Sequence, residues 1–276
     1  MINESGEVRC CPPHSLLDKE RHYPYIEYMT QLDFISLGQI TKSEQFSLFS
    51  DDLKAAIKPK AHISYGKTEK FFNGISASEI AEYKKYWTSV KPTDTSEVFK
   101  RYLFAFMSVH TSWRSNLNGY NAIKDWIQWI NNAELLKSKL QTSGVGLHNN
   151  RTRFVTEFSQ LFWRNPKKFN KIENESWVGY RNRLEEQILG LGLAKTSFAL
   201  EMVYPNECEV TCMDTHLFQL YGLNQTRDSA HYEAIEQHWI SMCKMWNVPS
   251  YIARCIWWDK NQSKTDSRYW SYVLEN

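Results

Sequence analysis

The sequence lacks the features that mark zinc-binding, membrane-spanning and low-complexity proteins. Six cysteines occur in 276 residues, but no pair has the CxxC spacing typical of zinc or iron–sulfur sites, so we expect no metal and no cofactor. No signal peptide, long apolar run or lipidation motif is visible, which favours a reduced cytoplasmic compartment. Internal repeats are also absent from the sequence. These absences favour an ordinary globular protein.

The chain also lacks a large excess of either charge. It has 33 Lys and Arg against 31 Asp and Glu, a formal net charge of +2. Binding to a nucleic acid would therefore require a local basic patch. Apolar residues make up 42% of the chain, enough for a sizeable core. Its 11 tryptophans and 15 tyrosines can pack in that core or form stacking surfaces.

Most periodic segments have the three- and four-residue spacing of amphipathic helices, which predicts an all-α fold. One helix is expected to start near Thr95 or Ser96. Further helices are expected over 120–140, from Asn150 onward, over 228–246 and over 249–258. Residues 1–90 are predicted to be an N-terminal extension, and residues 91–276 the core domain.

The stretch from Leu184 to Gly222 has the pattern helix, tight turn, helix, loop, helix. Gly190 and Gly192 supply the turn, because glycine tolerates tight backbone conformations. The helix that follows begins with N–H groups that lack intrahelical partners, and such a start can bind one phosphate of a nucleic-acid backbone. Asp214 precedes the next apolar run, where it can cap the helix. A carboxylate held near a bound phosphate also suits chemistry at a sugar–base bond.

Two segments of this stretch resemble the helix-hairpin-helix-GPD superfamily of DNA glycosylases, which includes endonuclease III, MutY-type adenine glycosylases and 8-oxoguanine glycosylases. Ile188–Gly192 is similar to the family hairpin, and Met213–His216 is similar to the segment with the catalytic aspartate. The resemblance covers roughly residues 97–222. It implies a helical domain that binds duplex DNA, flips a base out and uses Asp214 as its catalytic carboxylate.

The resemblance also implies roles for residues outside the hairpin. His110, Thr111, Trp113 and Arg114 follow the first core helix, where the family's DNA-facing cleft lies, and are expected to contact DNA or the base. His110, Trp113 and Arg114 are expected to line the base pocket. Trp113 has a core role as its alternative, and Arg114 a solvated surface position. Arg151 and Arg153 fit a basic pair that opens a later helix, where they could touch phosphate or be solvated.

In bifunctional members of the superfamily, a lysine two residues after the second hairpin glycine forms a Schiff base with the sugar. That position is Ala194 here, and Lys195 follows it. Because a helix turns about 100° per residue, we expect Lys195 to point elsewhere unless the hairpin is one residue longer. Lys195 is kept as a second catalytic candidate, although a monofunctional enzyme is preferred. The predicted DNA-binding residues of the hairpin are Gly190, Gly192, Ala194, Lys195 and Thr196.

Three functions remain open. An N-glycosylase would excise a damaged or modified base. Bacteriophage proteins related to alpha-glutamyl/putrescinyl thymine pyrophosphorylases, which act as amino acid:DNA transferases, would modify a base without removing it, and the hairpin from Gly190 to Phe198 resembles theirs. A non-catalytic DNA-binding protein would use Asp214 only as a cap. Each of these functions implies a monomer that binds duplex DNA and does not associate with a membrane. The protein would act in the cytoplasm, which is the host cytoplasm if a phage encodes it.

Overall fold

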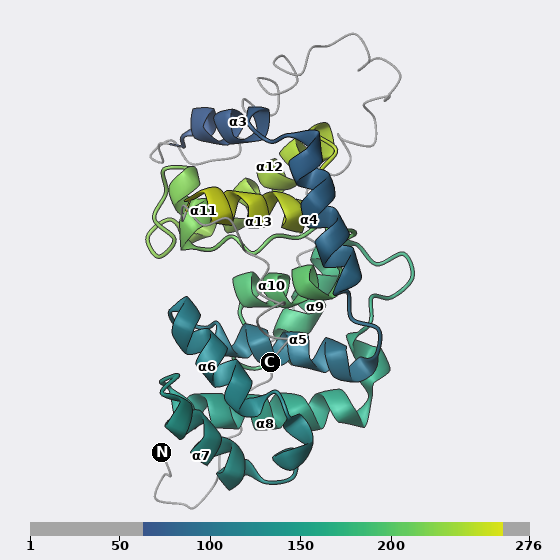
Figure 1. The fold of residues 1–276 in the computed structure, drawn as a ribbon, viewed down its shortest axis with the longest axis vertical. Helices are drawn as coiled ribbons and strands as arrows, with labels where there is room; N and C mark the ends of the chain where they lie inside the picture. The colour runs from purple at the N-terminus through teal and green to yellow at the C-terminus, as the bar shows by residue number, and fades with distance from the viewer. Residues whose placement is uncertain (1–62, 262–276) are drawn as a thin grey trace, which may run out of the picture. The chain divides into compact units, whose positions relative to one another are not determined.

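The computed structural model describes residues 63–261, and all regular elements in that range are helices (Figure 1). The predicted all-α class is therefore confirmed. Residues 1–62 of the expected N-terminal extension, and the tail after residue 261, lie outside the described residues. The α-helices are α3 (Tyr65–Asn73), α4 (Ala77–Ser89), α5 (Thr95–Met107), α6 (Trp113–Ile123), α7 (Ala133–Ser143), α8 (His148–Arg164), α9 (Trp177–Gln187), α10 (Leu193–Val203), α11 (Thr215–Leu220), α12 (Tyr232–Met245) and α13 (Ser250–Asn261).

One group of helices comes from a continuous stretch of chain, α5 to α8. Helix α5 packs against α6, α8 and α10, and α7 packs against α6 and α8 (Figure 1). The interior is aromatic: the ring of Phe99 stacks on Phe158 at 5.5 Å, and Tyr102 lies 5.2 Å from the same ring. Burial of a side chain of this size stabilises the fold by roughly 1.5–3 kcal/mol. Helix α10 therefore rests on a densely packed support.

A second group joins helices from opposite ends of the described chain. Helices α3 and α4 pack beside α12 and α13, with Phe71 stacked 5.8 Å from Trp239 and Trp87 lying 4.6 Å from Tyr251. At the surface, Lys260 forms a 3.0 Å ion pair with Glu79. Residues 63–90 thus belong to the same compact unit as the helices that follow. The predicted domain boundary near residue 90 stays a prediction.

The single helix expected over 120–140 is wrong. Helix α6 ends at Ile123, a 3₁₀ turn follows at Trp126–Gln128, and α7 begins at Ala133. The Trp129 indole N–H donates to the Ile123 carbonyl at 2.7 Å, and the Asn132 side chain caps α7 by accepting from the Leu135 N–H at 2.9 Å. The apolar residues of two helices and the turn between them thus have, in the sequence, the spacing of a single amphipathic helix. The expected α5 start is confirmed, with Asp94 as its cap.

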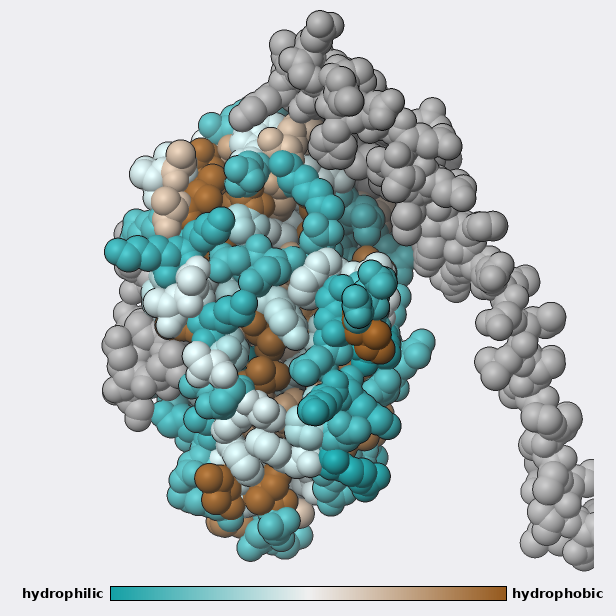
Figure 2. Space-filling view, turned by 90° about the vertical axis from the view of Figure 1, so that its right-hand side faces the viewer, coloured by the Kyte–Doolittle hydropathy of each residue, from teal (hydrophilic) through white to brown (hydrophobic). Residues whose placement is uncertain are grey.

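On the face that Figure 2 shows, the surface of the described residues is mostly hydrophilic. Apolar residues appear there as small separate groups. The large apolar side chains with the most exposure are Ile127, Leu147, Ile172 and Leu189. Isolated exposed apolar residues are normal in folded proteins. Across the described range, none of the helices combines the length and apolar character that crossing a bilayer requires.

Candidate functional site

The hairpin between α9 and α10 is shaped by its two glycines. Gly190 has a φ of +93°, and a Cβ atom there would lie 2.4 Å from the Phe154 ring, so only glycine fits. Gly192 is the N-cap of α10, and no described side chain caps that end of the helix. The N–H groups of Lys195 and Thr196 donate to the Gly192 carbonyl at 2.9 and 3.0 Å, so those of Leu193 and Ala194 are left for an external acceptor.

Asp214 serves as a helix cap and also faces a cavity. Its Oδ1 accepts hydrogen bonds from the backbone N–H groups of His216 and Leu217 at 3.0 and 3.1 Å, which fixes the start of α11. Its Oδ2 lies 3.5 Å from Nη1 of Arg254, and the side chain is 20% exposed. The capping and catalytic interpretations of this aspartate are therefore compatible, because the two oxygens have different surroundings.

Arg254 connects Asp214 to a buried glutamate. Its Nε donates to Oε1 of Glu201 at 3.0 Å, and its Nη2 lies 2.7 Å from Oε2. The guanidinium is also 5.0 Å from the Phe198 ring and 5.3 Å from the Tyr251 ring. Burial raises the pKa of Glu201 to about 7, while the charge of Arg254 opposes that shift. These contacts hold Arg254 rigidly and leave Nη1 to face Asp214.

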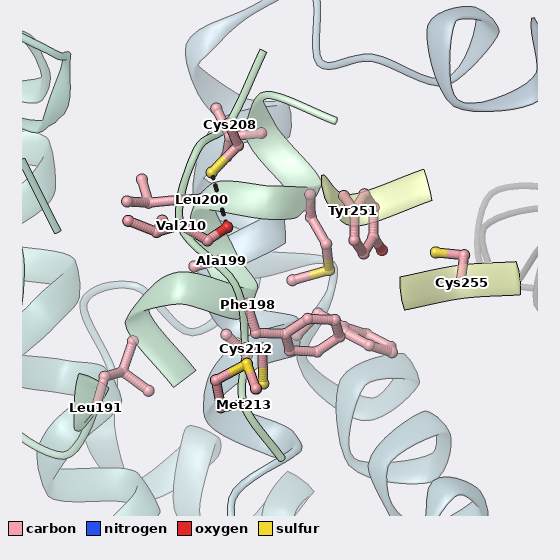
Figure 3. Packing of buried hydrophobic residues seen from close by; sticks show 14 of the residues in the cluster. Leu191, Phe198, Ala199, Leu200, Cys208, Val210, Cys212, Met213, Tyr251 and Cys255 are labelled. Carbon is pink, nitrogen blue, oxygen red and sulfur yellow. Dashed lines mark hydrogen bonds between the residues drawn. The ribbon is translucent and has the colours of Figure 1, made fainter. Parts of the chain in front are cut away.

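The chain reaches Asp214 through an extended segment, Cys208–Asp214, which is fixed on both sides. Figure 3 shows this segment passing alongside α10, with Cys212 and Met213 next to Phe198. Glu236 of α12 accepts the Thr211 N–H at 2.8 Å, while Glu201 of α10 accepts a hydrogen bond from the Cys212 backbone. Successive N–H groups of an extended chain point in opposite directions, so the two glutamates hold the segment from opposite sides.

Helix α12 supplies further contacts to the same segment. The Tyr232 hydroxyl donates to the Thr211 carbonyl at 2.7 Å and accepts from the Met213 N–H at 3.2 Å. Glu236 is also paired with Arg181, and both side chains are fully buried. Such a network fixes the backbone that leads into the candidate catalytic aspartate.

A cavity of about 110 Å³ brings together four residues that the sequence predicted, Thr111, Trp113, Lys195 and Asp214. Its wall comes from the α5–α6 region, α10, the Cys208–Asp214 segment and α13. The lining residues are Ser108, Thr111, Trp113, Asn116, Lys195, Phe198, Cys212, Asp214, Arg254 and Trp258. Burial raises the pKa of the Cys212 thiol to about 12, so this thiol stays protonated at neutral pH.

The expectation that Lys195 points away from the site is wrong. Lys195 lies in the first turn of α10 and lines the same cavity as Asp214, with Nζ 5.7 Å from the Phe198 ring. A rotation of about 100° per residue sets the direction of one side chain relative to the next, but the direction of the cavity relative to α10 depends on the packing of α6 and α13. Ala194, at the position of the family's lysine, is half-buried.

Arg151 was expected to touch phosphate or to be solvated, and both expectations are wrong. Its guanidinium donates to the backbone carbonyls of Gly146 at 3.0 Å, Val109 at 2.6 Å and Phe106, and the residue is 4% exposed. It therefore ties the end of α5 to the start of α8 and is not available to a phosphate. Arg153, in contrast, is exposed, and its guanidinium lies 4.8 Å from the Phe154 ring beneath the hairpin.

Three other predicted residues lie outside the cavity wall. His110 has a φ of +49° in the turn between α5 and α6, where its side chain is exposed, and Arg114 lies on an exposed position of α6. Neither lines the cavity. Thr196 is completely buried beneath the first turn of α10. Thr196 is consequently unavailable to DNA in this structure.

The structure adds residues that the sequence patterns missed. Arg254 and Trp258 stand one helical turn apart on α13, and both line the cavity, as does the buried Asn116 of α6. Glu201 carried a usable signal, since a single glutamate within the apolar run of α10 predicts a buried, paired carboxylate. No comparable signal marked Asn116.

The fold of this chain is that of helical DNA glycosylases. No model of a known protein family matches the chain, and no curated protein matches it in sequence. The chain is similar to the 8-oxoguanine DNA glycosylase of Methanocaldococcus jannaschii, with a TM-score of 0.54, 18% identity, and coverage of 80% of this chain and 96% of that one. For the glycosylase/lyase of that organism in complex with 15mer DNA containing 8-oxoguanine, the TM-score is 0.56, the identity 19%, and the coverage 73% and 98%.

A third similar structure is Tm1821, the 8-oxoguanine DNA glycosylase of Thermotoga maritima. Its TM-score is 0.53 at 13% identity, and the match covers 82% of this chain and all 100% of that one. Because the match spans nearly the whole length of each of these proteins, the likeness extends over the complete helical fold. At such low identity it establishes the fold, and the chemistry must be argued from the cavity.

Proposed function

We propose that this protein is a DNA N-glycosylase that removes a modified base from duplex DNA. The observation that carries the proposal is the cavity that Asp214 and Lys195 both line, beside the uncapped start of α10. A phosphate site next to a carboxylate-bearing cavity suits an enzyme that holds the backbone and acts on an extruded nucleotide. The fold shared with proteins named as DNA glycosylases supports the same conclusion.

The first step is binding of the DNA backbone. The free N–H groups at the start of α10 donate hydrogen bonds to one phosphate, and the exposed Arg153 adds positive charge near the hairpin. Extrusion of the base costs a few kcal/mol of stacking. Three aromatic side chains in the cavity wall, Trp113, Phe198 and Trp258, offset that cost by stacking on the base.

The chemical step is cleavage of the bond between C1′ of the sugar and the base nitrogen. The electron pair of that bond leaves with the base, and the positive charge that develops on the sugar is stabilised by Asp214. The oxygen of a water molecule then bonds to C1′. The proton lost by that water passes to Asp214 and on to solvent, and the departing base takes up a proton from solvent.

Asp214→Asn tests this proposal, because asparagine keeps the helix cap and removes only the charge. Wild type should produce alkali-labile abasic sites in a duplex from a panel of damaged and modified bases, and the variant should be about 1000-fold slower. Asp94→Asn is the matched control, since Asp94 caps α5 outside the cavity and should be dispensable. Equal activity of wild type and Asp214→Asn would contradict the proposal.

The same reactions also define the nucleophile. With water as nucleophile, strands break only after alkali treatment, and borohydride traps no covalent complex. A trapped complex that disappears in Lys195→Gln would instead make Lys195 the nucleophile. Nucleosides of altered mass, without any abasic site, would contradict base excision altogether.

A further inference from the structure

We infer that Asn116 reads the extruded base, and that the base presents an N–H group next to a carbonyl on the edge that enters the cavity. This inference rests on the proposed function and adds a substrate class to it. Asn116 lies one turn after Trp113 on α6, lines the cavity that contains Asp214, and is only 3% exposed. Its Oδ1 is buried without a hydrogen-bond partner.

A buried acceptor without a partner needs an explanation. The large majority of buried side-chain polar atoms in folded proteins have a hydrogen-bond partner. The Asn116 backbone N–H already donates to the Ser112 carbonyl at 2.9 Å, so the helix does not depend on the side-chain amide. A leucine of similar size would fill the same space without an unsatisfied atom. The amide is therefore better explained by a ligand than by stability.

The hydroxyl groups in the cavity wall already use their protons within the fold. The Ser108 hydroxyl donates to the Ala105 carbonyl at 2.7 Å, and the Thr111 hydroxyl donates to the Met107 carbonyl at 2.6 Å. Both donors thus complete the end of α5. Among the described residues that line the cavity, Asn116 has a buried side-chain carbonyl oxygen that accepts no hydrogen bond from the rest of the protein.

The chemistry of an amide defines the edge that fits it. Asn116 can accept one hydrogen bond through Oδ1 and donate through Nδ2, so it is complementary to an N–H group adjacent to a carbonyl. This edge occurs in thymine, uracil and guanine and in their modified derivatives. Such bases also depart readily as anions once the C1′–N bond breaks. The cations of Lys195 and Arg254 in the same wall favour an anionic leaving group.

The test uses binding, so that it does not depend on cleavage. Duplexes would carry 2′-fluorinated, non-cleavable nucleotides of thymine, uracil, guanine or 8-oxoguanine, each with a counterpart methylated at its ring N–H. A tetrahydrofuran duplex provides a site without any base. Wild type should bind at least one N–H probe about 10-fold or more tightly than its methylated counterpart. In Asn116→Leu that ratio should fall to near 1, with unchanged affinity for the tetrahydrofuran duplex.

Asn118→Leu is the matched control, because Asn118 is an exposed asparagine of the same helix outside the cavity wall. It should keep the wild-type preference. Asn116→Leu should also unfold at the wild-type temperature or above, since it removes an unpaired buried acceptor. A clear drop in unfolding temperature would show that the amide is structural and overturn the inference.

The two proposals fail in different ways. Retention of the N–H preference by Asn116→Leu, or absence of any such preference in wild type, overturns the role of Asn116 even where bases are excised. Conversely, an Asn116-dependent preference without excision of any base supports the reading role and contradicts the glycosylase activity.

Discussion

Two buried arginine–glutamate pairs flank the Cys208–Asp214 segment, and they differ in one respect. Arg181 and Glu236 are both fully buried, and their contacts end at the segment. Arg254 and Glu201 are nearly as buried, but Arg254 also reaches Asp214 and lines the cavity. Buried ion pairs are weak contributors to stability, because desolvation opposes the attraction of the charges. Stability therefore does not explain either pair, and only the arginine of the second pair contacts the candidate catalytic carboxylate.

Burial and pairing alone do not identify a functional charge, because the two pairs share both features. Both pairs have a glutamate that accepts a backbone N–H from neighbouring residues, Thr211 and Cys212. What separates them is the third partner of the arginine. A cation that contacts the candidate catalytic carboxylate can fix its orientation and its charge, whereas one that ends in the core holds only the backbone.

The largest expected effects come from removing each arginine. Arg181→Met and Arg254→Met should each lower the free energy of unfolding by about 3–5 kcal/mol, because each leaves a buried glutamate without its partner. Only Arg254→Met should also reduce excision, by about 100-fold, since Asp214 loses its orienting contact. Urea unfolding and single-turnover kinetics on the folded fraction measure the two effects. Equal loss of activity in both variants would erase the distinction.

Double variants that neutralise both members of each arginine–glutamate pair separate the effect on stability from the effect on activity. Arg181→Met with Glu236→Gln, and Arg254→Met with Glu201→Gln, keep an acceptor for the backbone N–H and leave no unpaired charge. Both double variants should recover most of the stability lost by the single ones. Excision by the Arg254 and Glu201 double variant should stay about 100-fold below wild type, whereas the Arg181 and Glu236 double variant should excise at the wild-type rate. Wild-type excision by the Arg254 and Glu201 double variant would mean that Arg254 acts through stability alone.

The smallest expected effect is a pH dependence that belongs to Glu201. Its folded pKa of about 7 lies above its usual value of 4.5, so between these pH values the folded protein keeps a proton that the unfolded chain has lost. The free energy of unfolding should therefore fall as pH rises from about 4.5 to 7, by at most about 1.4 kcal/mol per pH unit. Glu201→Gln should lack this slope.

His238 also changes the stability of the protein with pH, so the effect of Glu201 is measured as the difference between the wild-type and Glu201→Gln curves. Burial lowers the pKa of His238 to about 4, so its own contribution to stability is lost as pH falls from about 6.5, opposite to that of Glu201. Subtracting the Glu201→Gln curve from the wild-type curve removes the histidine term. Glu134→Gln, at an exposed position of α7, is the control and should follow wild type throughout.

Local patterns predicted the helical class, the hairpin and the cap at Asp214, because each depends on residues close together in the sequence. The cavity could be predicted only in part. Asn116, Glu201 and Arg254 come from three different helices, and their proximity follows from tertiary packing. The burial of Arg151 could not be predicted for a related reason: a charged residue at the start of a helix is usually exposed, but here its guanidinium donates to two distant carbonyls, of Phe106 and Val109, and to the nearby carbonyl of Gly146.

The packing of α3 and α4 on α13 bears on how the chain is made. Tyr83 bonds to Asp259, 176 residues later, and Lys260 pairs with Glu79 across 181 residues. The helices from α5 to α8 are contiguous and can assemble while the chain is still on the ribosome. Helices α3 and α4 can instead reach their partners on α12 and α13 only after those helices have been synthesised.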